Sequence, residues 1–153
     1  MKQRLRSLFE ILTVGFPFCA FKVLTGHFLL DVPGFAIAGA FLLALGIVDI
    51  GINFTNFVGV ALGRETRLLG ICAIHQAVLA FRPRRAAWSE VASSADALLS
   101  FGIVAYMLLS RSLSHLSELQ LYVWTLSTVL NVLGAGLGRV VQSVRELHAG
   151  KTA

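Results

Sequence analysis

Residues 35–63 read FAIAGAFLLALGIVDIGINFTNFVGVALG, and the one charged side chain among them is that of Asp49. An α-helix needs about 20 mostly apolar residues to cross the roughly 30 Å hydrocarbon core of a lipid bilayer. At 29 residues, this stretch can cross with some tilt or can extend beyond the membrane. It therefore predicts a membrane-spanning helix.

Three further apolar stretches flank this one. They cover residues 11–30, 92–110 and 119–138, and turn-forming residues 31–34 separate the first of them from residues 35–63. The chain of 153 residues is 56% hydrophobic and 14% charged, whereas soluble domains carry about 25% charged residues. This composition excludes a soluble globular enzyme, a disordered tail and a nucleic-acid-binding domain. We predict an all-α polytopic membrane protein, in which four transmembrane helices form one bundle within residues 1–153.

Segment 66–81 differs from the four spans. Its apolar part, Leu68–Phe81, is short for a span and lies between two groups of arginines. We expect it to form a short helix at the inner membrane surface, or to extend the second span beyond that surface. With four spans, eleven of the thirteen lysines and arginines fall on one side of the membrane. They are Lys2, Arg4, Arg6, Arg64, Arg67, Arg82, Arg84, Arg85, Arg139, Arg145 and Lys151.

This bias predicts that both termini are cytoplasmic and that the protein resides in a plasma or inner membrane, because lysine and arginine concentrate in cytoplasmic loops. The basic side is expected to attract anionic lipid headgroups, at about 1 kcal/mol per basic residue near the membrane. This interaction accounts for the net charge of +5 without a nucleic-acid partner. The arginines expected to contact headgroups are Arg64, Arg82, Arg84, Arg85 and Arg139.

The pattern N-x-x-G-x-x-L-G-R occurs twice, at Asn56–Arg64 and at Asn131–Arg139. The copies are 75 residues apart, at the inner ends of the second and fourth spans. Two explanations remain open: duplication of a helical hairpin, or convergence on a common membrane motif. Each copy contains G-x-x-x-G, which lets another backbone approach closely. It therefore predicts helix packing, with a polar lining for a solute path as the alternative. The glycines concerned are Gly59, Gly63, Gly134 and Gly138.

Ionisable side chains inside a membrane are costly and are usually paired. The spans contain three of them: Lys22, Asp49 and Asp96. The antiparallel geometry of the first two spans predicts that Lys22 and Asp49 form an ion pair. This pair either fixes the register of the hairpin or belongs to a proton- or ion-coupled site that includes Asn53 and Asn56. Asp96 is expected about one turn inside the inner interface, at the depth of Arg64 and Arg139, in a structural salt bridge.

The sequence contains none of the common nucleophile, phosphate-loop, dinucleotide or zinc-protease motifs, and its four histidines are scattered. We therefore expect no catalytic site, metal or cofactor. The favoured function is that of a non-enzymatic structural or accessory subunit, which packs against copies of itself or against other membrane subunits. The alternative is a small oligomeric transport protein that uses a polar cluster inside the membrane. The polar candidates are Lys22, Asp49, Asn53, Asn56, Asp96 and Asn131.

Overall fold

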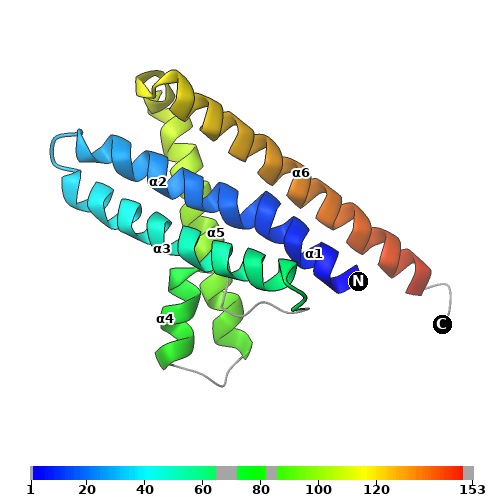
Figure 1. Cartoon of the computed structure of the whole chain (residues 1–153). Coiled ribbons are helices and arrows are strands. Elements are labelled where there is room, and N and C mark those ends of the chain that lie inside the picture. The colour runs from blue at the N-terminus through cyan, green and yellow to red at the C-terminus, as the bar shows by residue number, and fades with distance from the viewer. Residues whose placement is uncertain (1, 65–71, 82–85, 150–153) are drawn as a thin grey trace.

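The computed structural model describes residues 2–64, 72–81 and 86–149, and the protein is all-α within these ranges. A continuous N-terminal helix consists of α1, the π-helical turn η1 and α2, and four further α-helices follow it (Figure 1). The elements are α1 (Lys2–Glu10), η1 (Ile11–Gly15), α2 (Phe16–Leu30), α3 (Ala36–Ala61), α4 (Ala73–Phe81), α5 (Ala86–Leu109), the 3₁₀ turn η2 (Ser112–His115) and α6 (Glu118–Ala149).

Three of the described helical stretches are long and apolar enough to cross a membrane: Gln3–Leu30, Ala36–Ala61 and Glu118–Gly138. They match the first, second and fourth predicted spans, except that the first helix starts nearer the N-terminus. The third predicted span, residues 92–110, falls in α5, where the apolar part is the shorter stretch Ser94–Leu109. The prediction of an all-α chain with long apolar helices is therefore confirmed.

The hairpin of α2 and α3 is held by close contact between the two backbones. A Cβ atom added to Gly26 would lie 2.5 Å from the backbone nitrogen of Leu43, and one added to Gly39 would lie 2.7 Å from the backbone nitrogen of Leu30. Such contact is possible only where both helices lack a side chain. Gly34 has a φ of +83° and completes the turn between the helices.

Helix α2 is the centre of the molecule. Its side chains Phe18, Phe21, Leu24 and Leu29 form one hydrophobic cluster with residues of α3, α5 and α6. The rings of Phe21 and Trp124 lie 4.8 Å apart between centroids and join α2 to α6. Large apolar side chains cover the outside of the bundle as well, which is the surface expected of helices that face lipid.

The two halves of the chain are arranged differently. In the first half, α2 and α3 lie side by side, whereas α5 and α6 diverge from η2 (Figure 1). Within the described residues, α6 packs on α2 and η1, and α5 packs on α2 and α4. The arrangement of two similar hairpins, which the repeated motif suggested, is not seen.

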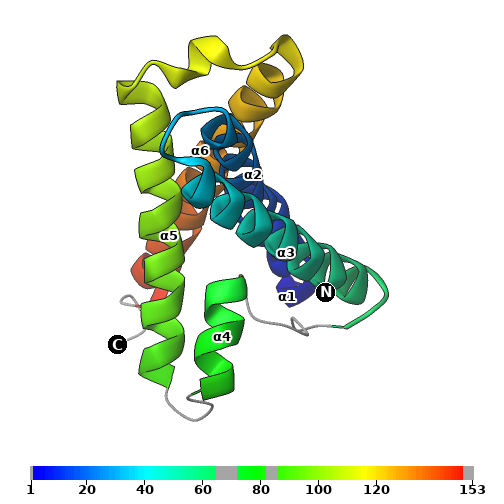
Figure 2. The ribbon, with the colours of Figure 1, turned by 90° about the vertical axis from the view of Figure 1, so that its left-hand side faces the viewer.

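Helix α4 starts against the middle of α3 and runs beside the first half of α5 (Figure 2). We expected segment 66–81 to lie at the inner membrane surface or to extend the second span, and its place relative to a membrane stays a prediction. A hydrogen bond at the first residue of α4, described below, joins this helix to α3. Residues 66–71 of the expected segment lie outside the described residues.

Candidate functional site

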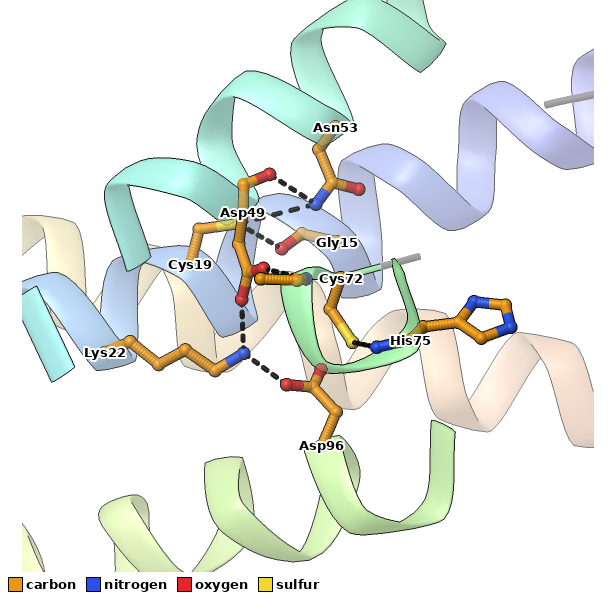
Figure 3. A network of polar contacts seen from close by, with 9 residues as sticks. Gly15, Cys19, Lys22, Asp49, Asn53, Cys72, His75 and Asp96 are labelled. Atoms are coloured by element: carbon orange, nitrogen blue, oxygen red, sulfur yellow. Dashed lines mark hydrogen bonds and ion pairs between the residues drawn. The ribbon is translucent and has the colours of Figure 1, made fainter. Parts of the chain in front are cut away.

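Lys22, in the middle of α2, connects three helices. Its side chain is fully buried, and its Nζ lies 2.5 Å from Oδ2 of Asp49 on α3. The same Nζ donates to Oδ1 of Asp96 on α5 (Figure 3). Both carboxylates are buried, with exposed fractions of 1% for Asp49 and 4% for Asp96. We call these three residues the ionic cluster.

The second oxygen of Asp49 binds the start of α4. The backbone N–H of Ala73 donates to Asp49 Oδ1 at 2.6 Å. The N–H groups in the first turn of a helix have no partner within that helix, and the helix dipole there favours negative charge. Asp49 therefore explains why α4 begins at the middle of α3.

A second polar layer connects the ionic cluster to η1. Asn53 lies one turn beyond Asp49, and its Nδ2 donates to the backbone oxygen of Asp49 at 2.9 Å and contacts Cys19 Sγ at 3.5 Å. The Cys19 thiol donates to the backbone oxygen of Gly15 at 3.1 Å. A Cβ atom on Gly15 would lie 2.2 Å from Asn53 Oδ1, so the space for the amide depends on this glycine. Asn56 continues the same face of α3 and is also buried.

Asn131 and Gly134 bring α6 onto η1. Asn131 Nδ2 donates to the backbone oxygen of Thr13 at 3.4 Å, and a Cβ atom on Gly134 would lie 2.4 Å from Thr13 Oγ1. A π-helical turn widens the helix locally and often occurs at functional sites. In this protein, Asn53 of α3 and residues Asn131 and Gly134 of α6 lie against η1.

The predicted packing role holds for only part of the glycine motif. Gly59 is buried, and Gly134 makes the close contact with Thr13. Gly63 lies beyond the end of α3 with a φ of +110°, and no atom of the described residues lies within 4 Å of a Cβ added to it or to Gly138. Close packing at these two glycines is therefore not seen within the described part of the chain, and their packing against another chain stays a prediction. Helix α3 has already ended at Ala61 when Gly63 is reached.

Asp96 lies deeper in the bundle than expected. The sequence predicts a position near the inner interface, because the apolar stretch that contains Asp96 starts at residue 92. Helix α5 instead begins at Ala86 and extends past the hairpin as the partner of α4, so that ten residues precede Asp96. Its carboxylate consequently meets Lys22 rather than an arginine at the interface.

Of the predicted headgroup arginines, the structure describes the side chain of Arg64, which is exposed just after α3. For Arg139 it describes only the helical backbone, and Arg82, Arg84 and Arg85 lie outside the described residues. A basic residue that we did not single out has a defined role. Arg4 donates to the last carbonyls of α3, through Nε to Val60 O at 2.6 Å and through the guanidinium NH2 to Ala61 O.

The chemistry open to the site is limited by which of its side chains could bind a metal ion or react as a nucleophile. Within the described residues, no group of three or more His, Cys, Asp or Glu side chains could hold a metal ion. Near the first turn of α4, burial raises the pKa of the Cys72 thiol to about 11, so the thiol is protonated at neutral pH. The remaining polar groups can donate, accept or carry charge.

Fold and site together define an all-α protein with three helices suited to a membrane and a buried ionic cluster shared by three helices. Comparison with known protein families, with curated protein sequences and with solved structures finds no match for this chain.

Proposed function

We propose that this chain is a non-enzymatic integral membrane protein that serves as a structural or accessory subunit. In this proposal α5 joins the three longer apolar helices as a fourth membrane-embedded helix. The observation that supports it is the ammonium group of Lys22, which is fully buried and bonded to carboxylates from α3 and α5. The one ammonium group bridges two carboxylates and so ties three helices together, which is a packing role.

The outer surface supports the same proposal. Many large apolar side chains are exposed on α3, α5 and α6, among them Leu98, Leu109 and Val132. Lipid, copies of this chain or other membrane subunits would cover them. The lysine and arginine bias suggests cytoplasmic termini and an inner surface that attracts anionic headgroups.

Charge removal tests the packing role. Lys22→Met leaves two buried carboxylates without their cation, and we expect it to cost about 3–5 kcal/mol of stability. The triple variant Lys22→Met, Asp49→Asn, Asp96→Asn removes all three charges, and we expect it to regain most of that loss. Asp31→Asn, at an exposed turn, is the matched control and should have no effect. The measurement is thermal unfolding in detergent, together with the set of proteins that co-purify.

A transport function is the second candidate, and one observation favours it. Helix α4 is short, and its N-terminal end meets a buried carboxylate at the middle of α3. Short helices that end at mid-membrane and point their N-termini at a ligand occur in many transporters. Lys22, Asp49, Asn53 and Asn56 would then belong to the solute site.

Flux measurements separate the two candidates. The purified chain is reconstituted into proteoliposomes, and proton and Na⁺ flux are compared with those of the triple variant. If the intact chain conducts while a stably folded triple variant does not, transport is the function and the packing proposal fails. If both leave the vesicles equally tight, the transport candidate fails.

A further inference from the structure

The ionic cluster has one negative charge too many. It contains one ammonium group and two carboxylates, all nearly or fully excluded from solvent. When all three groups are ionised, their net charge is −1. A buried charge without compensation is among the most unfavourable features that a protein can contain, and in lipid no water can reach it to lower the cost.

The surrounding helices supply little to balance that charge. Helix α2 adds the Cys19 thiol, and α3 adds the neutral amide of Asn53. Cys72, just before α4, and His75, within it, are the next groups. The His75 backbone N–H donates to Cys72 Sγ, and the His75 ring points away from the cluster (Figure 3). Among the described side chains of α2 to α5 that face the carboxylates, Lys22 is the one cation. The N-terminus of α4 contributes at most about half a positive charge.

Two buried hydroxyl groups, each one helical turn along the chain from a cluster residue, have no partner among the described residues. Ser100 lies one turn after Asp96 on α5, and Thr25 lies one turn after Lys22 on α2. Their exposed fractions are 0% and 1%, and neither Oγ atom has a hydrogen-bond partner in the part of the chain that the structure describes. A buried hydroxyl without a hydrogen-bond partner is unfavourable, so a nearby donor would stabilise both groups.

We propose that the ionic cluster binds one exchangeable proton, which Asp49 and Asp96 share. A hydronium ion transfers its proton to a carboxylate oxygen and leaves as water, so the step forms one O–H bond, breaks one and oxidises nothing. The neutral cluster then consists of an ammonium, a carboxylate and a carboxylic acid. Hydroxyl oxygens such as those of Ser100 and Thr25 can accept a hydrogen bond from an acid O–H. Two carboxylates in one site commonly hold a single proton. The inference applies to a packing subunit and to a transporter alike, because it concerns only the charge of the site.

Infrared spectroscopy of the purified protein at neutral pH tests this proposal, because a carboxylic acid shows a C=O stretch that a carboxylate lacks. We expect one such band, and we expect Asp49→Asn and Asp96→Asn each to abolish it. Each of these variants leaves one ammonium with one carboxylate, so that no proton is needed. Asp31→Asn, the exposed control, should keep the band. Lys22→Met, if it folds, should about double it, because both carboxylates then lack their cation.

Two results would overturn the proposal. One is the absence of the band from the intact, folded chain at neutral pH. The other is a band that both Asp49→Asn and Asp96→Asn leave unchanged, since the protonated carboxyl group would then lie outside the ionic cluster. The two single Asp variants keep the test decisive if Lys22→Met fails to fold, because both have balanced charge.

Discussion

The long, flexible side chain of Lys22 allows this one residue to contact two other helices. A lysine ammonium has three N–H donors at the end of a flexible apolar stem, so it can serve acceptors on separate helices. From the middle of α2, its Nζ reaches Asp49 on α3 and Asp96 on α5. Gly15 and Asn53 depend on each other for a steric reason, because Gly15 has no side chain and so leaves room for the Asn53 amide.

Gly15→Ala should destabilise the protein by about 1–3 kcal/mol, because the new methyl group overlaps the Asn53 amide. Gly51→Ala is the matched control in α3, where an added Cβ meets open space. That change should be neutral or stabilising by up to about 1 kcal/mol. Thermal unfolding in detergent measures both, and the addition of Asn53→Ala to Gly15→Ala should recover part of the loss. Equal stability of the two glycine variants would contradict the packing described here.

Cys72 should react slowly with alkylating reagents in the folded protein. Burial raises the pKa of its thiol from 9.0 to about 11, so at pH 8 its thiolate fraction is about one hundredfold below that of an ordinary cysteine. Labelling by iodoacetamide in a Cys19→Ala background measures the rate, and unfolding in a denaturing detergent should restore rapid labelling. Reaction of the folded protein at the rate of a free thiol would show that Cys72 is not buried.

At the scale of elements, two helix ends are satisfied by side chains from elsewhere in the chain. Asp49 accepts from the N-terminus of α4, and Arg4 donates to the C-terminus of α3. In both cases a charge meets the end of the helix dipole that it favours. The N-terminal part of the first helix is thereby held against α3.

Arg4→Gln should loosen the last turn of α3. Loss of the two charge-assisted hydrogen bonds is expected to cost about 1 kcal/mol, because Arg4 is partly exposed and water screens the interaction. Faster hydrogen–deuterium exchange near Val60 is the expected signal. Arg6→Gln is the control, since Arg6 is exposed on the same helix. If the two variants exchange equally, Arg4 does not cap α3.

The elements differ in how far the sequence predicts them. The long apolar runs predict α2, α3 and α6, because a run of that length has few other stable conformations in a membrane. The contact between Lys22 and Asp49 follows from counting residues on either side of one tight turn. The position of α4 does not follow, since it depends on its packing against α5 and on a hydrogen bond to Asp49, both of which are tertiary contacts. The position of Asp96 does not follow either, because α5 begins at Ala86, before the apolar run from which the span was predicted.

At the scale of the whole molecule, apolar side chains lie both inside and outside, and the charges are at the centre or near the ends. Asp49 lies about 18–20 Å from either end of α3, at 1.5 Å per residue. If α3 crosses the bilayer, the ionic cluster therefore lies near its centre. Composition alone predicts that the chain resides in a membrane. It does not predict which glycines contact another backbone, because Gly26 and Gly39 look no different in sequence from Gly63 and Gly138.

We expect the ionic cluster to lie near the centre of the bilayer, and a spin label at Leu98 measures this depth. Leu98 is two residues from Asp96, and its exposed fraction of 74% leaves room for the label. Leu62, at the end of α3 with an exposed fraction of 82%, provides the interfacial control. Each position is changed to cysteine in a Cys19→Ala, Cys72→Ala background and reconstituted in lipid. The label at Leu98 should collide with oxygen and be shielded from a water-soluble nickel chelate, whereas the chelate should reach the label at Leu62. A label at Leu98 that the chelate reaches as readily as the one at Leu62 would show that the ionic cluster does not lie in the bilayer core.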